Sequence, residues 1–376
     1  MNAAEGFLKE KEGAPAFRPG GLHSNETNGM RDMRLAITGG AGFLGYHLCN
    51  KLSGSFSDVI ALDMAPIDSR EYPRNVKGYE VDVRESGRLV EMFKGVDVVI
   101  HAATALPLRK RDEIFDINVN GTRGVLEAAR VNDIERIIYI SSTAVYGIPK
   151  ENPVYEDAAL CPMGPYSESK IEAERICGGY RGDGLGVTIV RPKTFIGPSR
   201  LGIFQILYDW VESGKKIPVI GSGMNRYQLL DVEDLTEAIS LLIQAPLSEV
   251  NGVFNIGAGS FGTVFEDVGS LCEYASTGAR VMPIPAKTAK LSLALLEKAR
   301  LSPIYNWVYN TADIDNYVST EKARKSLGWT PKYSNSQSLI RSYKWYMEHK
   351  SECPHPGITH RAAWSQGALR ILKIFF

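Results

Sequence analysis

The chain has 376 residues, which is long enough for one large α/β unit and a smaller lobe, each with its own core. Lysine plus arginine equals aspartate plus glutamate, at 43 each, so no overall field attracts nucleic acid, and we expect no nucleic-acid partner. Five cysteines without a CxxC pair indicate a reduced, cytoplasmic protein without a metal site.

The first segment, residues 1–32, contains charges, glycine and proline but no continuous apolar stretch. It fits neither a signal peptide nor a transmembrane helix. We therefore expect a disordered leader ahead of the folded chain.

A glycine-rich turn, TGGAGFLG, follows the first apolar run, residues 35–37. A strand, a tight turn and a helix N-terminus in this order let backbone N–H groups and the helix dipole face an anion, because no Cβ atoms intervene. The expected ligand is a dinucleotide pyrophosphate, and the alternative is a flexible turn without a ligand. The cofactor contacts expected here are Gly39, Gly42, Phe43 and Leu44.

A second apolar run, residues 59–62, ends in Asp63, about 20 residues beyond the glycines, where an acidic side chain reaches the adenosine ribose. A carboxylate at this place repels a 2′-phosphate, so Asp63 favours NAD over NADP. Arg70 nearby would soften that preference. The alternative is an ordinary turn aspartate.

Apolar strands and helical patterns then alternate, which predicts a parallel sheet covered on both faces. The predicted fold is α/β: a Rossmann-type doubly wound parallel sheet over residues 33–195, with a smaller C-terminal α/β substrate lobe over residues 196–350. Segments near residues 229–257 are candidates to return to the first sheet.

Three polar side chains are the candidates for catalysis. Ser142 follows a buried strand, at the edge where open α/β sheets bind ligands. Tyr166 and Lys170 are four residues apart on one face of a predicted helix. An ammonium group and a nicotinamide ring both favour the phenolate, so Tyr166 can act as general acid/base, with Ser142 hydrogen-bonded to the reacting oxygen. A YxxxK pair is also found on helix surfaces without any task, but here it follows the glycine turn, the acid and the serine in order.

Together these motifs resemble the extended short-chain dehydrogenases/reductases of the NAD-dependent epimerase/dehydratase family, over residues 33–349. The resemblance implies that Ser142, Tyr166 and Lys170 form the catalytic set, that Lys170 also binds the nicotinamide ribose, and that Asn118 orders the site. It implies further cofactor contacts at Asp82, Val83, Ala102 and Ala103. A homodimer is also expected.

The substrate side matches the family less closely. The stretch GSGMNRYQLLDVEDL resembles the segment whose arginine holds a nucleotide diphosphate, which implies this role for Arg226; a structural ion pair with Asp231 or Asp234 is the alternative. Nucleotide-sugar enzymes of the family commonly read RPxN after the catalytic helix, whereas this chain reads RPKT, with Thr194 as the candidate substrate contact. Family 4,6-dehydratases carry Asp-Glu where this chain has Thr143 and Ala144, which argues against dehydration.

Two reactions stay open. The family favours a nucleotide-sugar enzyme, most simply a 4-epimerase, in which a hydride leaves a sugar carbinol for NAD and returns to the other face. Thr194 and the apolar stretch 283–309 instead favour a keto-lipid reductase or dehydrogenase, although the leucines of that stretch can equally pack a small core. A non-enzymatic NAD-binding protein is disfavoured because the whole catalytic set is present.

The C-terminal tail, residues 351–376, has an amphipathic pattern. It suits a helix that lies on the inner face of a membrane or in the groove of a partner, and equally a segment that docks onto the protein's own surface. The apolar positions are Trp364, Ala368, Leu372 and Phe375, and the basic ones are Arg361, Arg370 and Lys373.

Overall fold

The structure is a computed structural model that describes residues 30–299, 301, 304, 306–352, 360–362, 364, 367 and 373. The expected leader therefore lies outside the described residues up to position 29, as do Ala368, Arg370, Leu372 and Phe375 of the expected tail helix. Every helix in the described ranges is too short or too polar to cross a membrane.

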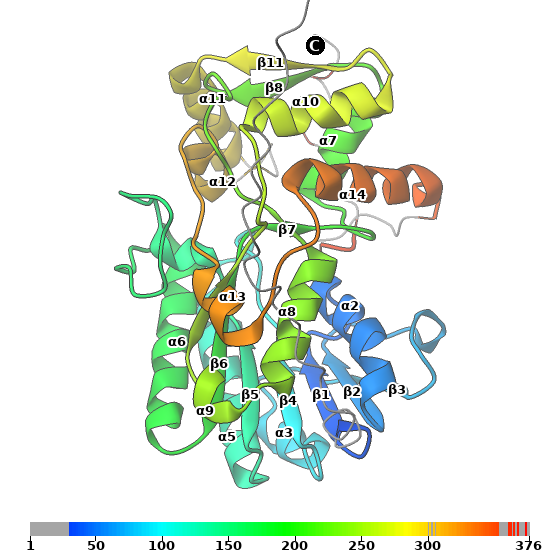
Figure 1. The fold of residues 1–376 in the computed structure, drawn as a ribbon, viewed down its shortest axis with the longest axis vertical. Coiled ribbons are helices and arrows are strands. Elements are labelled where there is room, and N and C mark those ends of the chain that lie inside the picture. Colours follow the sequence, from blue (N-terminus) through cyan, green and yellow to red (C-terminus); the bar gives the residue numbers. More distant parts are fainter. Residues whose placement is uncertain are drawn as a thin grey trace, which may run out of the picture.

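A parallel sheet of seven strands forms the centre of the fold (Figure 1). Its strand order is β10-β6-β5-β4-β1-β2-β3, so the order reverses beside β1, the place where open α/β sheets bind ligands. The inner strands are buried almost throughout because helices cover both faces of the sheet. The strands are β1 (Arg34–Thr38), β2 (Asp58–Asp63), β3 (Val76–Glu80), β4 (Val98–His101), β5 (Arg136–Ile140), β6 (Gly186–Pro192) and β10 (Val253–Ile256).

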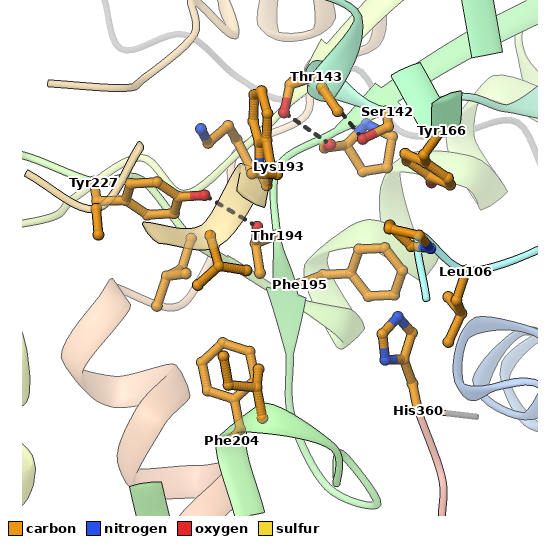
Figure 2. Close-up of a pocket in the computed structure, with 18 of the residues that line it drawn as sticks. Leu106, Ser142, Thr143, Tyr166, Lys193, Thr194, Phe195, Phe204, Tyr227 and His360 are labelled. Carbon is orange, nitrogen blue, oxygen red and sulfur yellow. Dashed lines mark hydrogen bonds between the residues drawn. The ribbon is translucent and has the colours of Figure 1, made fainter. Parts of the chain in front are cut away.

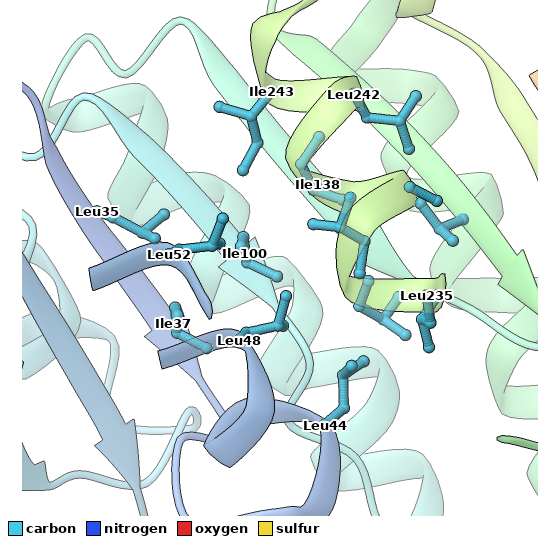
Figure 3. Packing of buried hydrophobic residues seen from close by; sticks show 14 of the residues in the cluster. Leu35, Ile37, Leu44, Leu48, Leu52, Ile100, Ile138, Leu235, Leu242 and Ile243 are labelled. Carbon is cyan, nitrogen blue, oxygen red and sulfur yellow. The ribbon is translucent and has the colours of Figure 1, made fainter. Parts of the chain in front are cut away.

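Alternate side chains of β1 point to opposite faces and enter two different cores. Leu35 and Ile37 pack with α2 (Phe43–Leu52) and α8 (Val232–Gln244), as Figure 3 shows. Ala36 packs on the other face, in a core shared by three helices. These helices are α3 (Ser86–Met92), α5 (Gly121–Val131) and α6 (Pro165–Gly182). The predicted α/β class with a doubly wound parallel sheet is therefore confirmed.

A smaller lobe sits beyond the carboxyl edge of the sheet (Figure 1). It contains two short parallel sheets, β8 with β11 and β7 with β9, and a core of its own built around Tyr208, Leu271 and Tyr343. Its elements are β7 (Phe195–Ile196), α7 (Ile203–Glu212), β8 (Lys216–Ile220), β9 (Leu230–Asp231), α10 (Val264–Ala275), β11 (Arg280–Ile284), α11 (Ala286–Lys298), α12 (Asn306–Thr311) and α14 (Asn335–His349).

Two elements that follow the start of this lobe return to the large sheet. Strand β10 pairs with β6, and α8 packs in the same core as Leu35 and Ile37. Trp329, which follows α13 (Glu321–Leu327), is buried in this core too. The remaining short elements are η1 (Ser53–Ser55), η2 (Ser69–Glu71), α4 (Arg111–Phe115), η3 (Asp116–Asn120), η4 (Thr143–Tyr146) and α9 (Leu247–Val250).

Candidate active site

The glycine turn between β1 and α2 is tightly enclosed by backbone. Gly39 has a φ of +76°, and a Cβ atom there would lie 2.7 Å from the amide nitrogen of Ala103. A Cβ at Gly45 would lie 2.0 Å from the carbonyl oxygen of Gly39. No side chain caps α2 at Gly42, so the N–H groups of its first turn remain for a ligand. This geometry fits a dinucleotide pyrophosphate at Phe43 and Leu44.

Asp63 ends β2 beside this turn. Its carboxylate accepts hydrogen bonds from the backbone N–H groups of Ala41 (3.0 Å) and Ala65 (2.9 Å). Burial raises the pKa of Asp63, against the lowering effect of these backbone bonds. Arg70 pairs with Asp68 at 2.6 Å, so its guanidinium is already engaged by a carboxylate.

The other expected cofactor residues lie along the same edge. Ala102 and Ala103 follow β4, and their N–H groups donate to the carbonyl oxygen (3.1 Å) and hydroxyl (3.3 Å) of Thr38. Asp82 follows β3 and pairs with Arg84, while Val83 is buried against Gly121 of α5. Among the described residues, no three His, Cys, Asp or Glu side chains come together as a metal site requires.

Tyr166 and Lys170 lie on the first turns of α6, which starts at Pro165. The ammonium of Lys170 donates to the carbonyl oxygen of Ile140 (2.9 Å) and lies 6.0 Å from the centre of the Tyr166 ring. Burial raises the pKa of Tyr166 to about 12, and hydrogen bonds with Ser142 and Thr104 act in the opposite direction. Burial lowers the pKa of Lys170 to about 8. Near neutral pH the pair is therefore a phenol beside an ammonium.

Ser142 is held at the end of β5 by the short helix η4. Its Oγ accepts a hydrogen bond from the N–H of Ala144 (3.1 Å), and the Thr143 hydroxyl donates to the carbonyl oxygen of Pro192 (3.3 Å). Thr143 and Ala144 therefore lie at the cavity wall, and neither side chain carries a carboxyl group.

Asn118 sits on η3, a π-helical segment of the kind often found at functional sites. Its Oδ1 accepts from the N–H of Ala105 (2.7 Å) and the hydroxyl of Thr104 (3.0 Å), and its Nδ2 donates to Ser169 Oγ (2.9 Å). Asn118 thus ties the loop after β4 to the helix of Tyr166. Thr104 was missed by the sequence analysis, although a hydroxyl residue just after a strand end was a usable signal.

A buried ion pair below Ser142 was also missed. Arg191 and Glu174 meet at 2.6 Å, with side chains only 5% and 6% exposed. The Ser141 hydroxyl donates to the same carboxylate, and Arg191 donates to the hydroxyl of Tyr146 (2.7 Å). The network links β5, β6 and α6, and so fixes the strand end that carries Ser142.

A cavity of about 820 Å³ opens between these groups and the lobe. Figure 2 shows Ser142 and Tyr166 at one end of it and Phe204 at the other. Thr194 lines the cavity, with its hydroxyl 3.5 Å from that of Tyr227. The lining is largely apolar and includes Leu106, Phe195, Leu229, Val268 and Trp307.

Arg226 does not line this cavity, whereas its neighbour Tyr227 does. The guanidinium of Arg226 lies over the rings of Phe261 (4.8 Å) and Tyr317 (5.1 Å). Because neighbouring side chains of an extended segment point to opposite sides, only one of the two can face the ligand. The position of Arg226 therefore gives no support to a diphosphate contact.

The alternative role of Arg226, an ion pair with Asp231 or Asp234, is not seen either. Asp231 lies 3.2 Å from Arg341, and Asp234 accepts hydrogen bonds from the backbone of residues 332 and 333.

The described residues of the tail contact the protein's own surface. Trp364 is 6% exposed, packs on Gly202 and lines the cavity together with His360. Arg361 pairs with Glu71 at 2.6 Å. Lys373 donates to the carbonyl oxygen of Asp209 (2.9 Å). These contacts favour docking on the protein over a membrane helix.

Comparison with known proteins agrees with this geometry. Residues 35–257 match the model of the NAD dependent epimerase/dehydratase family. A relative described as uncharacterized protein y4nG, from Sinorhizobium fredii, is 35% identical, covering 89% of this chain and 84% of its own. A UDP-glucose 4-epimerase from Lactobacillus helveticus is 26% identical over 84% of this chain and 98% of its own.

Among solved structures, the UDP-glucuronic acid 4-epimerase from Bacillus cereus in complex with NAD has a similar fold. Its TM-score is 0.70 at 21% identity, over 84% of this chain and 99% of that protein. The expectation of a keto-lipid enzyme finds no support in these comparisons. The matched family, the parallel sheet and the site at its carboxyl edge agree: this chain belongs to the NAD-dependent epimerase/dehydratase family.

Proposed function

We propose that the protein is a nucleotide-sugar 4-epimerase that uses NAD. The observation that carries the proposal is the placement of Ser142 and Tyr166 at the end of a large cavity, with Lys170 beside Tyr166 and the glycine turn nearby. The positions after Ser142 are Thr143 and Ala144, which offer no carboxylic acid for the loss of water.

The residues divide the proton chemistry among themselves. Tyr166 is a phenol in the protein alone, and the positive nicotinamide ring of bound NAD would favour its phenolate. The phenolate Oη then accepts the proton of the sugar hydroxyl that is oxidised and returns it at the end of the cycle. Ser142 donates a hydrogen bond to the same sugar oxygen, and the Lys170 ammonium favours the phenolate. Bound NAD would supply the hydride acceptor, held at the glycine turn with Asp63 toward its ribose.

The cavity suits a reaction in which the keto sugar rotates between the two hydride transfers. Its volume of about 820 Å³ exceeds what a sugar ring alone needs, so a keto sugar has room to present its other face. The relative from Lactobacillus helveticus is named a UDP-glucose 4-epimerase, which supports the same reaction.

An incubation in D₂O tests the proposal. The NAD-loaded protein is mixed separately with UDP-glucose, UDP-glucuronate and dTDP-glucose, and the sugars are followed by proton NMR. We expect interconversion at C4 without net NADH and without deuterium at C4, because the same hydrogen leaves and returns. Loss of water, with deuterium entering the sugar, would show a dehydratase instead. Stoichiometric accumulation of NADH would show a dehydrogenase.

A further inference from the structure

Lys193 is a buried cation at the wall of the cavity. It directly follows β6, its side chain is fully buried, and it lines the cavity beside Thr194 and Tyr227 (Figure 2). In the sequence it is only the third letter of RPKT, with no role implied by the family resemblance.

All the described groups around its ammonium are neutral. The Nζ atom donates to the carbonyl oxygen (3.0 Å) and the side-chain Oδ1 (2.6 Å) of Asn316. It also lies 4.7 Å from the centre of the Tyr227 ring. An ammonium has three N–H donors, and Asn316 accepts from two of them.

A neighbouring buried cation, Arg191, has a carboxylate as counter-charge. It lies two residues earlier, still on β6, and pairs with Glu174. No carboxylate of the described residues forms a salt bridge with Lys193, and burial alone lowers its pKa to about 7. A buried ammonium without a counter-charge is costly, which is why the pKa falls and why Lys193 is charged only in part near neutral pH. An anion bound beside it would favour the charged form, so a lysine at the wall of a ligand cavity needs a physical reason.

A second buried donor belongs to the residue that contacts Lys193. The Nδ2 atom of Asn316 is buried and has no hydrogen-bond partner in the described part of the chain. Buried polar groups normally have partners, and exceptions are often explained by a ligand. The third N–H of the Lys193 ammonium and the Nδ2 of Asn316 are thus two adjacent donors for which the described residues supply no acceptor.

We propose that Lys193 binds an anionic oxygen of the substrate, belonging either to a phosphate or to a carboxylate. This inference rests on the proposed function, because it names the residue that recognises the charged part of a nucleotide sugar. It gives to Lys193 the part that the family resemblance implied for Arg226, whose guanidinium lies over the rings of Phe261 and Tyr317 instead.

Arg200 is the competing cation. It also lines the cavity, but its guanidinium lies over the rings of Phe43 (5.2 Å), Phe195 (5.8 Å) and Phe204 (5.7 Å). Phe43 belongs to the cofactor turn, whereas Phe204 lies at the end of the cavity away from Tyr166, so these rings do not assign Arg200 to one side of the cavity. The test therefore includes both cations.

Calorimetric binding to the NAD-loaded protein tests the proposal without requiring turnover. The variants are Lys193→Met, which keeps the length and removes the charge, Arg200→Met, and Lys94→Met as a control on the exposed surface. The ligands are UDP, UDP-glucose, UDP-glucuronate and uridine. Lys193→Met should weaken binding of the recognised anion by about 10- to 100-fold and leave uridine unchanged.

The ligands separate the two sources of the anion. Weaker binding of UDP by Lys193→Met identifies a phosphate. Unchanged UDP with weaker UDP-glucuronate identifies a carboxylate. Equal affinities in wild type and Lys193→Met, losses only in Arg200→Met, or no binding of any charged ligand by the wild type would each overturn the inference.

Thermal unfolding separates binding from a structural role. Removal of an uncompensated buried charge should leave the melting temperature of Lys193→Met at or above that of the wild type. A lower melting temperature with unchanged ligand affinities would mean that Lys193 only holds Asn316. If the anion effect is found but no nucleotide sugar is epimerised, the inference stands and the proposed reaction fails.

Discussion

Arg191 and Glu174 meet at 2.6 Å directly below the strand end that carries Ser142, and both side chains are almost excluded from solvent. The pair joins α6 to β6, and through Ser141 it also holds β5. A buried ion pair of this kind fixes the relative positions of the elements that carry it. Removal of one partner leaves the other as a buried, unpaired charge.

Glu174→Gln should therefore lower the free energy of unfolding by about 3–5 kcal/mol, because it leaves the Arg191 guanidinium buried and unpaired. Urea denaturation measures this. The double variant Glu174→Gln/Arg191→Met should recover part of the loss. Glu172→Gln, which breaks an exposed pair with Arg175 on the same helix, should cost about 0.5 kcal/mol or less. Equal effects of the two single variants would contradict the assignment.

Tyr166→Phe keeps the ring and removes the proton donor. Turnover should fall by about two to four orders of magnitude while NAD affinity stays near the wild-type value. Lys170→Met should reduce both turnover and NAD affinity, because this ammonium is expected at the nicotinamide ribose as well as beside the phenol. Steady-state rates and fluorescence titration of NAD measure the two effects. Retained turnover in Tyr166→Phe would place the acid/base group elsewhere.

Asp63→Ser should narrow the preference for NAD over NADP, because the carboxylate that repels a 2′-phosphate is removed. Titration of both cofactors against wild type and variant checks this. Asp68→Asn is the control, and it also tests whether freeing Arg70 from its pair alone admits NADP. Wild-type protein that binds NADP as well as NAD would remove the argument for Asp63.

His101 should make the fold sensitive to acid. It is 1% exposed and hydrogen-bonded to the hydroxyls of Thr38 (2.7 Å) and Thr122 (3.0 Å). Burial lowers its pKa to about 3, from the ordinary histidine value of 6.5. The unfolded chain therefore binds a proton that the folded chain does not, and stability is lost as pH falls from 6.5 toward 3.

The loss from this one group approaches about 1.4 kcal/mol per pH unit below the unfolded pKa. Urea unfolding at several pH values between 7 and 4 should show a shallower decline for His101→Gln than for wild type. His349→Gln on α14 serves as the comparison. Parallel curves for all three proteins would show that other groups carry the acid sensitivity.

Removal of residues 353–376 should lower the melting temperature, because Trp364 is buried against Gly202 in the folded protein. Liposome co-sedimentation of the full chain should be absent. If the full chain binds anionic vesicles, and truncation abolishes that binding without changing the melting temperature, the tail lies on a membrane instead.

Some of the site could be predicted because its signals are local. The glycine turn and Asp63 belong to one β-α-β unit, and Tyr166 and Lys170 share one helix face. The partnership of Lys193 with Asn316 joins residues 123 positions apart, and no spacing rule connects them. The choice between Arg226 and Tyr227 depends on which side of one short segment faces the cavity, and tertiary packing decides this. The fold class could be predicted from the sequence even though it depends on distant contacts, because alternating strands and helices permit few arrangements.

The return of α8 and β10 to the large sheet sets the order in which the protein can be completed. Leu35 and Ile37 at the cofactor turn share their core with residues of both elements, and with Trp329 near the end of the chain. A ribosome-bound fragment that stops at residue 195 lacks one helical cover and an edge strand, so its apolar face stays open to water. Contacts this distant in sequence form slowly, and the exposed face invites aggregation until they do. The large sheet is thus completed only after residue 329 has been synthesised, and binding of a cofactor at the glycine turn is expected after that point.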